Sequence, residues 1–212
     1  MRPAEYRYAA VLALTLVNVV WTIVTPDGDW SRAVAFALAS AALIVAIATS
    51  HARPGVRRTR TAIGIVVGLA IVTAAGAGLL PRWAWLVVGG VLSVAVPLAL
   101  VGGLLRLVRT EGVTLQAVAG SLAIYLLIGE AFAWAIGLFA QASSTSYFAS
   151  GAAATLSARV YYSFTVLTTT GFGDLTAATR AGHALAVVEM LVGQLYLVTV
   201  IGVVVGSFRR RS

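Results

Sequence analysis

The 212-residue sequence contains no cysteine and no lysine, and only 10% of its residues are charged. Without cysteine the chain has no disulfide and no thiolate metal site, so the redox compartment cannot be inferred. Its two histidines, His51 and His183, stand far apart in the sequence, and no catalytic or metal-binding constellation surrounds either of them. The sequence therefore gives no indication of an enzyme or of a cofactor.

Hydrophobic residues make up 60% of the sequence, which is too many for an ordinary soluble surface. They fall into six runs, each bounded by charged or turn-forming residues, and a membrane span needs about 20 apolar residues. We therefore expect an all-α membrane protein with six transmembrane helices. The runs are 8–24, 33–50, 61–80, 84–105, 113–140 and 181–208.

The net charge of +8 would suggest nucleic acid binding in a soluble protein, but here the distribution of arginine explains it better. If six spans alternate, eleven of the fifteen arginines fall on one side of the membrane. The positive-inside rule then places both termini in the cytoplasm, with no nucleic acid partner. The dominance of Ala, Val, Leu, Gly and Arg suggests a GC-rich bacterial source, and hence the inner (plasma) membrane.

Four of these arginines, Arg53, Arg57, Arg58 and Arg60, form a cluster between the second and third runs. Such a cluster can bind anionic lipid headgroups at the inner leaflet. It can equally serve only to orient the protein in the bilayer. The sequence leaves both interpretations open.

The segment between the fifth and sixth runs starts with small and polar residues, which predicts an exposed turret. An amphipathic helix is expected at Leu156–Thr168, with Thr155 or Ser157 as its N-cap. It is followed by a stretch rich in Thr and Gly. A simple turn would suit that composition, but a chance turn would not lie between an amphipathic helix and a run of membrane-spanning length.

This stretch, Thr169-Thr170-Gly171-Phe172-Gly173-Asp174, closely resembles the selectivity filter of potassium channels, usually written T-V-G-Y-G-D. It departs from that pattern at 170 and 172, without changing the backbone carbonyls. The resemblance implies a permeant K⁺ held by Thr169, Thr170, Gly171 and Phe172. Gly171 and Gly173 are expected to take positive φ, so that successive carbonyl oxygens converge on one axis.

The resemblance to potassium channels covers roughly residues 113–208 and implies the architecture. Residues 113–212 would form a pore domain, in which a re-entrant pore helix and filter loop join the fifth and sixth spans. Residues 1–112 would form a four-helix transmembrane domain. One filter strand supplies a quarter of the carbonyl cage, so a homotetramer is expected.

Several residues around the filter are candidates for its support. Tyr161 and Tyr162 resemble the aromatic pair that braces such filters. Phe172 lacks the hydroxyl of Tyr, so the bracing is expected to rely on ring packing and on bonds to Asp174. Thr165 occupies a position where some prokaryotic channels carry a Glu that pairs with the filter Asp.

Two carboxylates fall inside membrane spans, where charge is expensive and usually has a role. We expect Glu189 to bond a hydroxyl of the pore helix, for example that of Thr165. For Glu130 the sequence suggests no partner.

The sixth span carries the candidate gate. Gly193 follows Gly173 by twenty residues, where inner helices of the family often have a hinge, although close helix packing would also favour glycine. Gln194, Leu197, Ile201 and Val205 share one face at 3.6-residue spacing, which we assign to the cavity. Gln194 would be its polar member, and Ile201 with Val205 would form a hydrophobic constriction.

The fourth run has no basic residue between Ala84 and Leu105, so steep voltage gating is not expected. The preferred interpretation is a voltage-independent potassium channel. One alternative is the membrane subunit of a K⁺ uptake transporter, but such chains carry four degenerate filter units and this chain carries one. The other is a non-conducting membrane scaffold.

Overall fold

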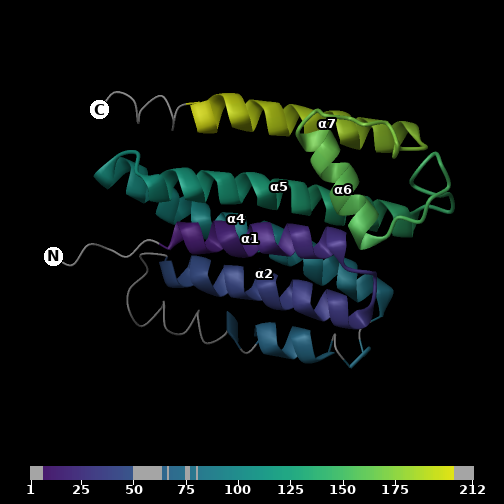
Figure 1. Ribbon diagram of the computed structural model, residues 1–212, viewed down its shortest axis with the longest axis horizontal. Helices are drawn as coiled ribbons and strands as arrows, with labels where there is room; N and C mark the ends of the chain where they lie inside the picture. Colours follow the sequence, from purple (N-terminus) through teal and green to yellow (C-terminus); the bar gives the residue numbers. More distant parts are fainter. Residues whose placement is uncertain (1–6, 50–63, 66, 75–76, 80, 203–212) are drawn as a thin grey trace.

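The computed structural model describes residues 7–49, 64–65, 67–74, 77–79 and 81–202 (Figure 1). Within these residues the regular structure is helical, apart from one isolated β-bridge between Phe148 and Ala177. The expectation of an all-α protein is confirmed.

A helix lies in each of the six hydrophobic runs, and a further short helix precedes the Thr- and Gly-rich stretch. Residues 64–74 are helical wherever they are described. The named elements are α1 (Tyr8–Val24), α2 (Asp29–Thr49), α4 (Arg82–Glu111), α5 (Leu115–Ala142), α6 (Leu156–Leu167), α7 (Arg180–Tyr196) and the π-helical η1 (Leu197–Ile201).

Four helical segments are long and apolar enough to cross a membrane, and α1 is a shorter apolar helix. The four are Asp29–Ala48, Trp83–Glu111, Leu115–Ala142 and Arg180–Ile201. The chain is thus a multi-pass membrane protein. The full set of six spans remains a prediction.

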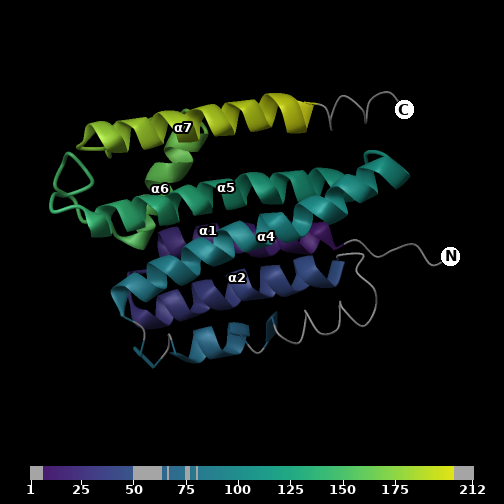
Figure 2. The same ribbon diagram turned by 180° about the vertical axis from the view of Figure 1, so that it is seen from behind.

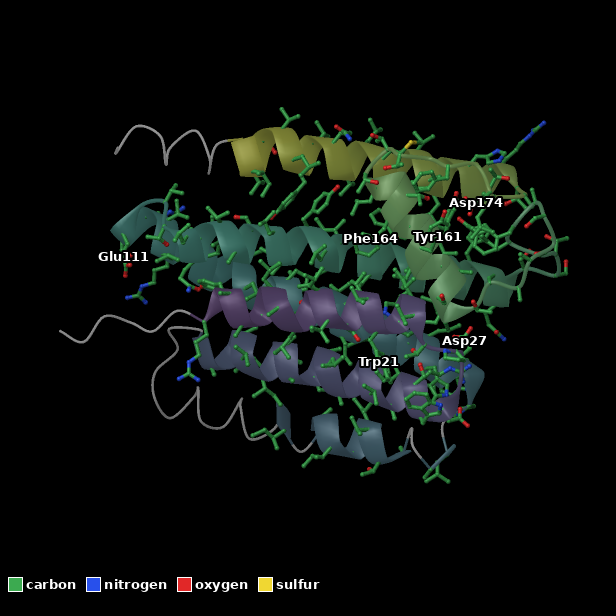
Figure 3. All side chains as sticks on the ribbon, in the orientation of Figure 1. Trp21, Asp27, Glu111, Tyr161, Phe164 and Asp174 are labelled. Atoms are coloured by element: carbon green, nitrogen blue, oxygen red, sulfur yellow. The ribbon has the colours of Figure 1, made fainter. Side chains whose placement is uncertain are left out.

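The long helices run side by side, and α6 lies obliquely between α5 and α7 near one end of the bundle (Figure 1). Seen from behind, α4 crosses the bundle at an angle (Figure 2). Asp27 and Asp174 lie at the same end of the molecule, which we call the filter end, and Glu111 lies at the opposite end (Figure 3).

The connection between α4 and α5 fixes how the two halves of the chain meet. Gly112 ends α4 with φ of 73°, and Thr114 caps α5 by accepting a hydrogen bond from the Ala117 amide. The three residues between the helices reach no further than about 14 Å. Because of this short link, α4 packs against α5 of its own chain. Tyr8 of α1 packs over Gly120 of α5 in the largest buried cluster.

Candidate functional site

The helix α6 is held in place at its N-terminus by two hydroxyl groups. Thr155 is the N-cap, since its side chain accepts a hydrogen bond of 3.2 Å from the Ala158 amide. Ser157, the other candidate cap, instead donates to the carbonyl of Ile23 at 3.2 Å. The first turn of α6 is thereby attached to the end of α1.

After α6 the chain turns its amide groups back toward the helix. The Thr169 amide donates to the Val166 carbonyl at 2.9 Å, and the amides of Thr170 and Gly171 donate to the Thr165 carbonyl at 2.9 and 3.1 Å. These bonds satisfy carbonyls that a helix end leaves without partners. In a trans peptide the C=O points opposite to the N–H of the next residue, so three successive carbonyls, those of residues 168–170, point away from α6.

Along the next residues the backbone φ angle alternates between positive and negative values. Thr169, Gly171 and Gly173 have φ of 57°, 53° and 82°, so every second residue lies in the left-handed region. The positive φ expected at both glycines is confirmed. That of Thr169 was not expected, because a side chain rarely tolerates it. Such residues cluster at functional sites.

The aromatic side chains around this stretch divide into two groups. Tyr161 stacks on Phe172, with ring centroids 6.4 Å apart and the rings 5° from parallel, and it lies beside Asp174 (Figure 3). Tyr162 is buried on the other side of α6, against Tyr147 and Phe148. Only Tyr161 therefore braces the Thr- and Gly-rich stretch of its own chain.

Most residues of the turret expected before α6 are exposed, apart from Tyr147 and Phe148. Tyr147 and Phe148 are buried, and two hydrogen bonds attach them to the segment that follows the Thr- and Gly-rich stretch: Ala149 N to Thr176 O at 2.9 Å and Ala178 N to Tyr147 O at 2.8 Å. Burial also raises the pKa of the Tyr147 phenol, because it disfavours the charged form.

A short helix whose C-terminus meets a strand of alternating hand, followed by a membrane helix, is the arrangement of an ion-conducting pore loop. Residues 122–210 match a family model described as an ion channel. The match covers less than half of the chain and supports an ion channel of the pore-loop superfamily. No curated protein and no solved structure matches the chain.

Within the channel domain, Glu189 is fully buried and bonded to a hydroxyl of the pore helix α6, as expected. The hydroxyl is that of Ser163, and not that of Thr165, which donates to the Tyr162 carbonyl at 2.8 Å. The Ser163 hydroxyl also lies 2.7 Å from the carbonyl of Gly129. The side chain of Ser163 thus links α5, α6 and α7 behind the filter.

Glu130, for which the sequence offered no partner, accepts a hydrogen bond of 3.0 Å from the side-chain amide of Asn18. Both side chains are buried, and they join α1 to α5. Sequence reasoning missed Asn18 because the two residues are 112 positions apart.

Gln194 of α7 contacts the first residue of the predicted filter, since its Nε2 donates to the Thr169 hydroxyl at 3.1 Å. Its neighbour Gly193 is buried, and a Cβ added there would overlap the carbonyl oxygen of Leu167 at the end of α6. The same carbonyl accepts a hydrogen bond from the Tyr125 hydroxyl at 3.3 Å. Close approach of α6 and α7 is therefore one reason for glycine at 193, and its hinge role remains a prediction.

The cavity face predicted from 3.6-residue spacing needs a correction. Residues Leu197–Ile201 form a π-helix, in which hydrogen bonds join residues five apart, so each residue turns less far about the axis. The Thr199 hydroxyl donates to the Leu195 carbonyl, which competes with the α-helical bond at that oxygen. The 3.6-residue spacing therefore no longer assigns Ile201 to the face of Gln194 and Leu197, and its place in a constriction remains a prediction. Val205 and the cluster of Arg53, Arg57, Arg58 and Arg60 lie outside the described residues.

Proposed function

We propose that this protein is a passive K⁺-selective channel whose filter is formed by Thr169, Thr170, Gly171, Phe172 and Gly173. The observation that carries the proposal is the alternation of positive φ along Thr169–Gly173 above the end of α6. A dehydrated K⁺ needs a ring of converging carbonyl oxygens, and backbone of alternating hand presents them on one side. The permeating K⁺ is the transported ion and not a resident cofactor.

The end of α6 adds an electrostatic contribution. A helix C-terminus carries about half a negative charge. Because the filter follows directly from Leu167, this charge lies at the inner end of the conduction path. Four such helix ends would favour a cation there.

A homotetramer is part of the proposal, because one chain supplies only one filter strand. Exposed apolar side chains support it. Phe172 is 70% exposed in the single chain. A series of α7 and η1 side chains is also exposed, and neighbouring subunits or the cavity would cover their faces. The series comprises Val187, Val188, Leu191, Leu195 and Val198.

Opening is proposed to be independent of a charged sensor. The described part of α4 from Trp83 to Leu105 carries no charge, and Arg106 and Arg109 follow at the end away from the filter. A span without charge gives the membrane field little to act on. The gate is proposed on the last helix, with Gly193 as its hinge and Val205 in the constriction, both termini in the cytoplasm of a bacterial cell and the filter opening outward.

Ion flux into liposomes tests the proposal. Purified protein should let K⁺ move down its gradient without another ion, and Ba²⁺ should block this movement. Flux that requires a coupled ion or a second subunit would favour the uptake-transporter alternative. A folded protein that carries no K⁺ flux would favour the non-conducting scaffold. Crosslinking in detergent should give a tetramer.

A further inference from the structure

A guanidinium group is buried at the filter end of the molecule without a salt bridge to any carboxylate among the described residues. Arg159, in the first turn of α6, is only 6% exposed. No carboxylate among the described residues lies within 4.0 Å of it. Its Nε donates to the Thr155 carbonyl at 3.2 Å and its Nη1 to the Ala133 carbonyl at 3.4 Å. A buried charge with only neutral partners is costly unless something else compensates it.

The neighbouring helix leaves room for this group. A Cβ added at Gly137 of α5 would overlap Arg159 Nη1. The guanidinium also lies over the indole of Trp134, 5.5 Å from the ring centroid. A long basic side chain near a helix end usually extends toward water, but here a glycine and an aromatic face hold it inside. The position of the charge is therefore built into the packing of α5 and α6.

Arg159 lines a crevice of about 370 Å³ between the α1–α2 turn and α4, α5 and α6. A second cation, Arg32, lines the same crevice and lies over the ring of Trp85 at 5.7 Å. Arg32 also reaches Asp29 at 3.3 Å, but both of these side chains are partly exposed, so the pair is weak. Asp27, Gln141 and Thr155 complete the polar lining.

We infer that this crevice binds a phosphate group, carried by an anionic phospholipid or free in solution. Guanidinium groups present planar forks of donors that match phosphate oxygens, and charge-assisted bonds of this kind are the strong ones. The guanidinium groups of Arg32 and Arg159 line the same crevice as the indoles of Trp85 and Trp134. Tryptophan side chains favour the membrane interface. The ligand would supply a direct counter-charge to Arg159, which forms no salt bridge with the Asp27 carboxylate in the same crevice, and would tie the α1–α2 turn to the pore helix. Asp27 opposes it.

Thermal unfolding of the purified full-length protein tests this site. Phosphatidylglycerol and inorganic phosphate are added separately, and zwitterionic phosphatidylcholine serves as the lipid control. We expect phosphatidylglycerol or phosphate to raise the melting temperature, and phosphatidylcholine not to do so. A response to the lipid alone identifies a membrane ligand, and a response to phosphate alone identifies a soluble one.

Replacing the buried Arg159 can prevent folding, so the variants are made at more exposed residues that line the crevice. Arg32→Gln should weaken the apparent affinity about tenfold or more by removing one fork, and Asp27→Asn should strengthen it. Arg109→Gln, at the opposite end of α4, is the matched control and should leave it unchanged. No shift with either anion, or equal losses in Arg32→Gln and Arg109→Gln, would overturn the inference. Neither outcome bears on ion selectivity, which is measured separately.

Discussion

The side-chain amide of Gln194 donates a 3.1 Å hydrogen bond to the hydroxyl of Thr169. Thr169 is the first residue of the filter and holds a positive φ without being glycine. The contact therefore joins the inner helix to the most strained residue of the filter. It links movement of α7 to the geometry at which the proposed ion path begins.

The first prediction concerns block by Ba²⁺, which has nearly the radius of K⁺ and twice its charge. It should bind the filter oxygens too tightly to leave. Thr169→Ala removes the innermost hydroxyl and should weaken the block in single-channel records. Gln194→Ala removes the contact but keeps that hydroxyl, and so should retain most of the block. Equal weakening in both variants would mean that the hydroxyl acts through Gln194 and not on the ion.

The bond between Ser163 and Glu189 should stabilise the channel domain. Ser163→Ala leaves the fully buried carboxyl of Glu189 without this partner, which costs about 1–3 kcal/mol of unfolding free energy. Thermal unfolding in detergent measures this loss. Thr165→Ala is the control, because that hydroxyl bonds only to the nearby Tyr162 carbonyl. If both variants lose the same stability, the bond between α6 and α7 contributes no more to the free energy of unfolding than the local bond of Thr165.

Asn18 and Glu130 should behave as a coupled pair. Asn18→Leu removes the donor from a buried carboxyl and should loosen the packing of α1 on α5, which lowers the melting temperature. The double variant Asn18→Leu/Glu130→Leu should recover most of the loss, since it buries no unpaired polar group. Additive losses in the double variant would show that the two side chains act independently.

Gly193→Ala should lower the open probability, because alanine favours a straight helix by about 1 kcal/mol. The added methyl group would also press on the Leu167 carbonyl, so a fall in melting temperature is expected as well. Gly202→Ala is the matched control, since its Cβ would meet no atom closer than 3.8 Å. Unchanged opening together with reduced stability would make Gly193 a packing residue only.

Local features of the site could be predicted from the sequence. The cap of α6, its extent and the positive φ of Gly171 and Gly173 follow from residues within a few positions of one another. The partner of Glu189 could not be predicted. Ser163 and Thr165 are two residues apart, about 200° around the helix, so the hydroxyl that faces α7 depends on how packing rotates α6.

Two other features also depend on information that a single sequence does not carry. The bond between Asn18 and Glu130 joins residues whose proximity comes only from the packing of α1 on α5. The π-helix at Leu197–Ile201 has no periodic signal, so the 3.6-residue pattern was extended through it. Both features depend on tertiary contacts, which decide between locally similar alternatives.

The reversal potential of the reconstituted protein, with K⁺ on one side of a planar bilayer and Na⁺ on the other, tests the central claim most directly. Gly173→Ala is a useful control, because alanine is strained at a φ of 82° while no neighbouring atom lies within 4 Å of its Cβ. It should therefore fold and lose selectivity or current. The account predicts a reversal potential in the parent protein that shows K⁺ permeating far better than Na⁺. A reversal potential near zero, which means equal permeability, would contradict it.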